Sequence, residues 1–328
     1  MSNAAPGNAA MRPGRPNLHP AALLWLALAV GPAQAQVPVP EQVQGNVSSA
    51  IETYRRGDAI GALNQLHPLA DAGDAEAQYT LGMVLEFGLR QSEEAAGWYR
   101  KAAESGHAAA ANNLGAMHYE GRGVPPDRTR ARELYRSAAE KNYAPAQYNL
   151  ALLFGQGIGG PRDEAQMLRW LERAARAGYA RAQAQLGRVH LEGIGVPPDA
   201  LAAARWFRPA AEQGNAWAQY FLGAMLQKGQ GLARNPAEAR VWLSRADEQH
   251  IAPAALSLAV LYETGAGVPA DAAAALRHFK RAADAGEADA VERLVRIYRN
   301  GELGAEADPV LEVLWTIQQR LVGNRKGN

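Results

Sequence analysis

Apolar and small residues recur along the chain with the period of an α-helix. In the stretch 108–143, Ala111, Leu114, Gly115 and His118 stand at i, i+3, i+4 and i+7. This spacing places all four on one face of a helix. The pattern predicts an amphipathic helix over the first third of the stretch.

A second helix follows after a short turn. Gly121 suits the left-handed backbone at a helix end, and Pro125 prevents the helix from continuing. Asp127 is a favoured N-cap residue, and Leu134 and Ala138 then lie on one face of the next helix. The stretch therefore predicts two antiparallel helices, a helical hairpin.

The hairpin pattern repeats with a fixed spacing. Leucines stand 36 residues apart at Leu114, Leu150, Leu186, Leu222, Leu258 and Leu294. The N-cap position of Asp127 is also filled by cap-forming types, namely Asp163, Asp199, Asn235 and Asp271. A constant period of this size is typical of stacked supersecondary units. The sequence predicts an all-α solenoid of helix pairs.

Some units depart from the period. Leu81 precedes Leu114 by only 33 residues, so we expect a tighter turn at 87–89. Tryptophans share one repeat position, which Leu314 holds in the last unit: Trp98, Trp170, Trp206 and Trp242. A buried aromatic of this size contributes about 2 kcal/mol, and we expect this series to form core.

Charge offers little guidance to a partner. The chain has 34 Lys and Arg against 33 Asp and Glu. Without Arg12 and Arg15, which lie in the N-terminal segment discussed below, 32 basic residues face 33 acidic ones, a net charge of −1. A near-neutral chain has no electrostatic footprint for nucleic acid or an anionic membrane.

The residue types argue against enzyme chemistry. The chain has no cysteine, which excludes disulfides and thiolate metal sites. His118 and His190 match positions that hold apolar residues in other units, so we expect packing roles and predict no metal, no cofactor and no catalytic residues. The glycines of 155–160 fit G-x-G-x-x-G, but a helix precedes them, which favours an interhelical turn over a phosphate site.

The N-terminus has the order of a secretory signal peptide. Arg12 and Arg15 precede an apolar run over 21–30, and Ala33-Gln34-Ala35 follows it. The run is about half of the ~20 residues that a membrane span needs. We expect cleavage after Ala35, export to the periplasm or beyond, and no stable membrane anchor afterwards.

The repeated motifs resemble a known family. Leu186-Gly187, Gly193-Ile194-Gly195-Val196, Trp206-Phe207 and Ala210-Ala211-Glu212-Gln213-Gly214 are similar to the Sel1-like repeat, a relative of the tetratricopeptide repeat. The resemblance covers about residues 50–320. It implies a right-handed α/α superhelical solenoid, whereas the period alone predicts only stacked helical hairpins.

These patterns divide the chain into four segments. We expect a signal peptide at 1–35, a flexible leader at 36–47, a solenoid of about seven to eight hairpins at 48–321, and a disordered tail at 322–328.

The candidate partner-binding groove lies on the first helices. In tetratricopeptide-type units these helices form the concave face, and aromatic and arginine side chains there are the types that anchor interfaces. The candidate residues are Tyr79, Asn112, Tyr148, Arg181, Arg188, Trp217, Tyr220 and Arg296. The alternative is that some of the tyrosines pack against the next unit.

The resemblance implies a non-enzymatic scaffold that binds a partner protein or peptide, as Sel1-like proteins do in envelope assembly, exopolysaccharide export or signalling. Two alternatives stay open: a hydrolase acting on cell-wall or β-lactam substrates, like some cysteine-rich relatives, and a secreted protein that engages a host receptor. The absence of cysteine weakens the hydrolase analogy.

Overall fold

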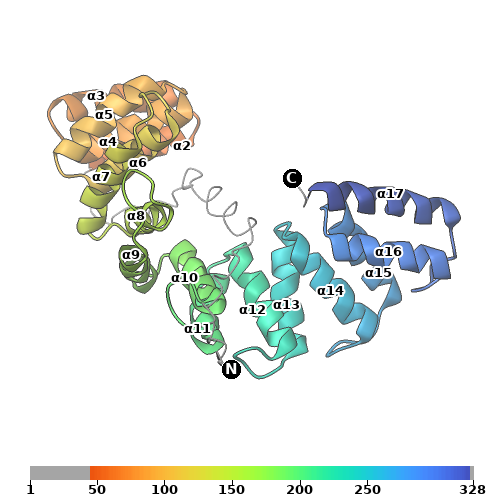
Figure 1. Cartoon of the computed structure of the whole chain (residues 1–328). Coiled ribbons are helices and arrows are strands. Elements are labelled where there is room, and N and C mark those ends of the chain that lie inside the picture. The colour runs from red at the N-terminus through yellow and green to blue at the C-terminus, as the bar shows by residue number, and fades with distance from the viewer. Residues whose placement is uncertain (1–44, 326–328) are drawn as a thin grey trace, which may run out of the picture. The chain divides into compact units, whose positions relative to one another are not determined.

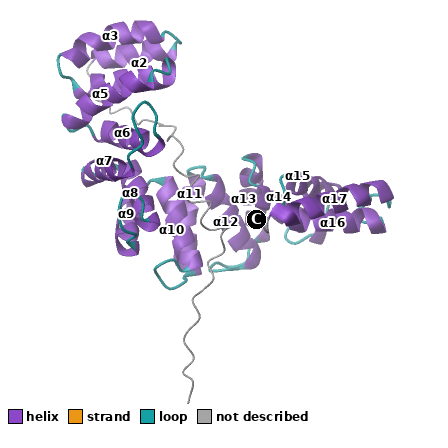
Figure 2. Ribbon diagram, turned by 45° about the horizontal axis from the view of Figure 1, so that its top comes forward, coloured by secondary structure: helices purple, strands orange, loops and turns teal. Residues whose placement is uncertain are grey.

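The computed structural model describes residues 45–325, and the side chains of 47–321. Within that range the chain forms α-helices and one π-helix, with no strand (Figures 1 and 2). The elements are α2 (Gly45–Arg55), α3 (Ala59–Asp71), α4 (Ala75–Met83), η1 (Val84–Gly88), α5 (Ser92–Glu104), α6 (Ala108–Glu120), α7 (Arg128–Glu140), α8 (Ala144–Gln156), α9 (Glu164–Arg176), α10 (Ala180–Glu192), α11 (Ala200–Glu212), α12 (Ala216–Lys228), α13 (Pro236–Glu248), α14 (Ala252–Thr264), α15 (Ala272–Asp284), α16 (Ala288–Asn300) and α17 (Pro309–Arg325).

The helices form successive pairs, from α2 with α3 to α16 with α17. Each second helix packs on its own first helix and on the first helix of the next pair. First helices also contact one another directly, as α6 does with α8 and α10 with α12. The predicted all-α solenoid is confirmed.

Side-chain caps start the second helices as predicted. The Asp127 carboxylate accepts from the Arg130 backbone N–H at 2.9 Å. The same bond recurs at Asp163, Asp199, Asn235 and Asp271. Each cap satisfies an N–H group that the helix itself leaves unpaired.

Two glycines shape the turn inside a pair. Gly157 ends α8 in the left-handed region at φ 68°, which costs a glycine nothing. Gly159 follows at φ 67°, and a Cβ there would collide with the Arg128 carbonyl oxygen of the preceding pair. The predicted interhelical turn is confirmed; it begins at Gly157, and Gly155 and Gln156 still belong to α8.

The core of each pair joins a small residue to a large one. A Cβ on Gly187 of α10 would lie 2.7 Å from the Phe207 ring of α11, and one on Gly82 would lie 2.7 Å from Tyr99. Phe207 and Tyr99 are fully buried, whereas Trp206, one position earlier, is half-buried. The tryptophan series is therefore divided: Trp98 and Trp242 are buried in the core, as predicted, whereas Trp170 and Trp206 lie at its margin.

The last pair contains a register shift. Tyr298 lies 36 residues after Tyr262, but Asp308, whose N–H donates to the Tyr298 carbonyl, lies 37 residues after Asp271, which bonds Tyr262 in the same way. One extra loop residue precedes α17. Trp315, not Leu314, therefore occupies the tryptophan position in this pair, which corrects the assignment made from the sequence.

The shortened unit differs from the prediction of a simply tighter turn. Its first helix widens into the π-helix η1, and only Leu89–Gln91 separate η1 from α5, compared with Gly121–Asp127 between α6 and α7. Arg90 takes the left-handed backbone at φ 59°. The loss of loop residues is thus absorbed by the helix end, where the Leu89 N–H bonds to the Val84 carbonyl.

The described helices reach past the solenoid bounds placed at 48 and 321. α2 begins at Gly45 and α17 extends to Arg325, because a helical backbone tolerates the glycine at 323 near a terminus. The signal peptide, and the leader up to residue 44, lie outside the described residues. None of the described helices combines the length and apolar character that crossing a membrane requires.

Candidate interaction surface

The structure separates the eight predicted groove residues by burial. Tyr79, Asn112 and Tyr148 are only 3% to 4% exposed. The others reach the surface: Arg181 and Arg296 are exposed, and the half-buried ones are Arg188, Trp217 and Tyr220.

The buried tyrosines pack against the following pair. Tyr79 stacks on His107 at 4.5 Å between ring centroids, and Tyr148 meets Tyr179 edge-on at 5.6 Å. Burial raises the pKa of Tyr148 to about 12. The alternative of packing against the next unit holds for both residues.

An aromatic cluster forms on α12. Trp217 and Tyr220 meet edge-on at 6.0 Å, and Phe221 lies 5.1 Å from Tyr220 and 6.1 Å from Trp217. Phe221 stacks at 5.0 Å on the fully buried Phe207 of α11. The half-buried rings are therefore held rigidly by the core, which limits the entropy lost when a partner binds.

Two arginines lie on the neighbouring first helix, α10. Arg188 pairs with Glu192 at 3.2 Å, while the exposed Arg181 places its charge near Tyr179. Burial raises the pKa of Tyr179, and the Arg181 charge acts in the opposite direction. Because α10 and α12 contact one another, the arginines and the aromatic cluster lie on adjacent helices. We call Arg181, Arg188, Trp217, Tyr220 and Phe221 the α10–α12 surface.

The sequence did not reveal Phe221 as part of this surface. Its repeat position holds Thr80, Asn113, Asn149, Gln185, Ser257 and Arg293 in other pairs, so the apolar residue was a visible departure. Trp217 was noticed for the same reason, whereas the repeat position of Tyr220 also holds Tyr79 and Tyr148. Arg296 lies on α16, outside the α10–α12 surface.

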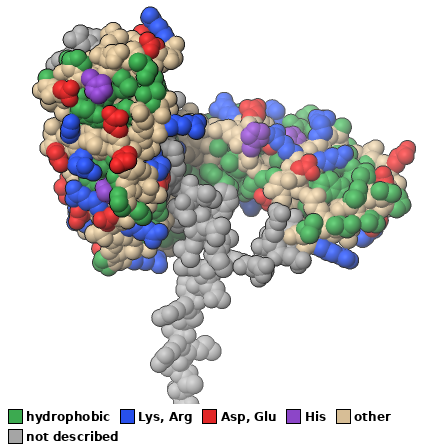
Figure 3. Space-filling model, turned by 90° about the horizontal axis from the view of Figure 1, so that it is seen from above, with side chains coloured by type: hydrophobic (Ala, Val, Ile, Leu, Met, Phe, Trp, Pro, Cys, Tyr) green, Lys and Arg blue, Asp and Glu red, His purple; other side chains and the backbone are tan. Residues whose placement is uncertain are grey.

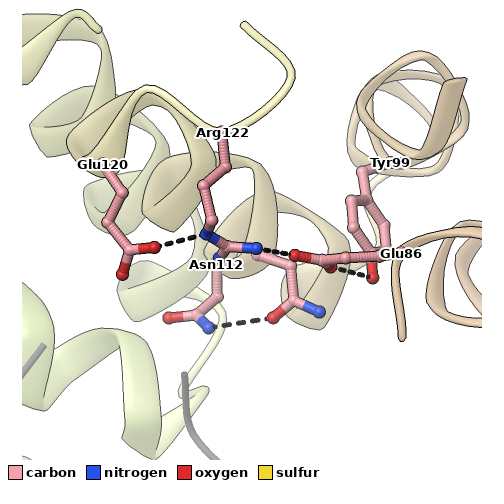
Figure 4. Close-up of polar contacts among 6 residues, drawn as sticks. Glu86, Tyr99, Asn112, Glu120 and Arg122 are labelled. Carbon is pink, nitrogen blue, oxygen red and sulfur yellow. Dashed lines mark hydrogen bonds and ion pairs between the residues drawn. The ribbon is translucent and has the colours of Figure 1, made fainter. Parts of the chain in front are cut away.

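A buried polar network links the second and third pairs (Figure 4). The Glu86 side chain in η1 is 3% exposed; it accepts from the Tyr99 hydroxyl at 2.8 Å and pairs with Arg122 of the next pair. Arg122 also pairs with Glu120. Glu86 is thereby fully partnered, as a buried charge must be.

Asn112 belongs to a separate contact beside this network. Its carbonyl oxygen accepts from the Asn149 amide of α8 at 3.0 Å, which links the first helices of successive pairs (Figure 4). Every one of these polar groups has a partner inside the stack. We therefore assign the network to holding the pairs together.

Within residues 45–325, no group of three or more metal-ligating side chains comes together.

Comparison with known proteins agrees with the repeat pattern. The Sel1 repeat model matches residues 75–107, 108–143, 144–179, 180–215, 218–249 and 252–287. The chain belongs to the Sel1 repeat family. Sel1 repeat proteins generally serve as non-enzymatic scaffolds for protein interaction.

Solved structures show the same architecture. The protective antigen c5321 of uropathogenic Escherichia coli, described as displaying an SLR fold, shares 26% identity at a TM-score of 0.74 over 85% of this chain and 65% of its own. This chain thus spans just under two thirds of that protein's length. A Sel1 repeat protein from Oxalobacter formigenes shares 30% identity at a TM-score of 0.65, over 74% and 96% of the two chains. No curated protein matches the chain.

Proposed function

We propose that this Sel1 repeat protein is exported and binds a partner protein or peptide through the α10–α12 surface. The observation that carries the proposal is that half-buried aromatic rings and two arginines lie on adjacent first helices. Tryptophan, tyrosine and arginine are the residue types that dominate binding energy at interfaces. The repeat position of Trp217 holds Ala109, Pro145, Pro253 and Asp289 in other pairs.

The side chains indicate what the partner offers. Half-buried aromatic rings bind apolar or aromatic side chains, and the exposed guanidinium of Arg181 binds a carboxylate in a forked geometry. A partner segment with an apolar residue near an acidic one fits both. Cofactors have no role in this proposal.

Export is the second part of the proposal and rests on the signal-like N-terminus. The location is the periplasm or the exterior, where an envelope-assembly, exopolysaccharide-export or signalling partner would meet the chain. The description of the Escherichia coli relative as a protective antigen supports a location outside the cytoplasm.

Crosslinked pulldown from the envelope fraction tests the binding surface. We expect Trp217→Ala with Tyr220→Ala to weaken capture of the partner about 30-fold, because each is a central anchor. Pro253→Ala with Leu256→Ala alters the same two repeat positions on α14 and serves as the matched control. Circular dichroism and thermal melting establish that both variants are folded.

The surface assignment is wrong if the α12 variant retains every captured protein at wild-type yield. Fractionation tests export independently: we expect the mature chain outside the cytoplasm, beginning at Gln36. Retention of the full-length chain in the cytoplasm would contradict this part alone.

A further inference from the structure

The outer face of α17 carries an unbroken apolar stripe. Its residues are Val310, Val313, Leu314, Ile317 and Leu321, each between 50% and 68% exposed. They stand at i, i+3, i+4, i+7 and i+11, which aligns them along one side of a helix. Apolar side chains gather at the end of the solenoid where α17 lies (Figure 3). We call these five residues the α17 stripe.

The stripe replaces charges that other second helices carry. With the register set by the caps Asp271 and Asp308, Leu314 matches Arg277, and the earlier pairs hold Arg169 and Arg205 there. Ile317 matches Lys280 and Leu321 matches Asp284. The three α15 residues at these positions are exposed to water. This reversal indicates that another apolar surface covers the stripe.

We propose that the stripe binds the same stripe of a second copy, forming a two-fold symmetric dimer through paired α17 helices. A two-fold interface uses the same patch on both subunits. The remaining large apolar side chains exposed on residues 47–321 are Ile60, Phe87, Leu201, Val241 and Val260, each on a different element. The described surface therefore offers no comparable stripe for a head-to-tail contact.

The area of the stripe is adequate for such a dimer. Five aliphatic side chains exposed to this degree present roughly 500 Å² of apolar surface, so two copies bury about 1,000 Å², the size at which specific interfaces begin. Between residues 309 and 321 the flanks carry one charge: Arg320 lies on one side and Gln318, which donates to the Ala283 carbonyl, on the other. An anionic membrane surface would instead call for a row of basic side chains.

Sedimentation equilibrium of the purified chain tests the proposal from about 0.5 to 50 μM. We expect a monomer–dimer equilibrium. Leu314→Arg with Ile317→Lys should raise the dimer dissociation constant at least about 30-fold, since it places cations at the centre of the interface. Both substitutions restore residues that α15 carries at these positions, so the helix should stay folded. Melting curves check this.

Val241→Arg is the matched control, because Val241 occupies the Leu314 position on α13. We expect it to leave the dimer unchanged. A chain that stays monomeric at every concentration overturns the proposal. A dimer that the α17 double variant leaves intact, or oligomers that keep growing with concentration, overturns it as well. Binding of a monomer to vesicles of uncharged phosphatidylcholine that the double variant abolishes would assign the stripe to a membrane instead.

Discussion

The second and third helix pairs carry a tyrosine at the same repeat position, yet the two hydroxyl groups meet opposite surroundings. Tyr99 of α5 donates to Glu86, whereas the buried hydroxyl of Tyr135 on α7 has no hydrogen-bond partner in the described part of the chain. Burial raises the pKa of both phenols, and Glu86 raises that of Tyr99 further. The difference originates in η1, which brings a carboxylate into the second pair. One side chain therefore serves as a polar link in one pair and only as a filler in the next.

Removing the cation of the network should have the largest effect on this comparison. We expect Arg122→Ile, which introduces the residue found at Ile158 and Ile194, to lower the free energy of unfolding by about 3 kcal/mol, because Glu86 remains buried without its positive partner. Urea unfolding followed by circular dichroism measures it.

The triple variant Glu86→Leu, Tyr99→Phe and Arg122→Ile tests whether the unpaired Glu86 carboxylate causes the loss of stability in Arg122→Ile. Replacing all members of a buried polar group by apolar ones is often nearly neutral, so we expect stability within about 1 kcal/mol of wild type. A triple variant as unstable as Arg122→Ile alone would show that Glu86 is not the source of the loss.

Removing the two hydroxyl groups should change stability in opposite directions. Tyr99→Phe is expected to destabilise by about 1.5 kcal/mol, because it takes a donor from a buried carboxylate. Tyr135→Phe is expected to stabilise by about 1 kcal/mol, because it removes an unpaired buried polar atom. Phe207 and Phe279 already fill this position in other pairs. Equal changes in melting temperature for the two variants would contradict the proposed difference between the Tyr99 and Tyr135 hydroxyl groups.

The smallest expected effect concerns the start of α5. Gln91 is its N-cap residue and makes no side-chain bond, unlike Asp127 at the start of α7. Gln91→Asp should raise stability by about 0.5 to 1 kcal/mol by pairing a free helix N–H. The backbone suits it, since Asp58 caps α3 at a similar φ of −92° against −93° for Gln91. A melting temperature unchanged or lower than wild type would contradict this.

Local rules predicted most of the solenoid. The N-caps, the left-handed glycines and the hairpins follow from backbone chemistry within a few residues. The 36-residue period then predicts the same hairpin in each successive unit. The candidate surface was only partly predictable. A spacing rule selected Tyr79 and Trp217 equally, because it counts positions and does not measure how closely neighbouring helices cover them.

The sequence by itself determined the helix pairs, their order and the departures at Trp217 and the shortened unit, because these depend on local propensity and on comparison between repeats. Only the tertiary structure decided which departures are buried. It also decided that Phe207 fills the core while Trp206 is only half-buried, and that one extra loop residue places the α17 stripe on the outer face. The reason is that burial and register result from contacts between pairs, and a single inserted residue rotates a helix by about 100° without altering its own pattern.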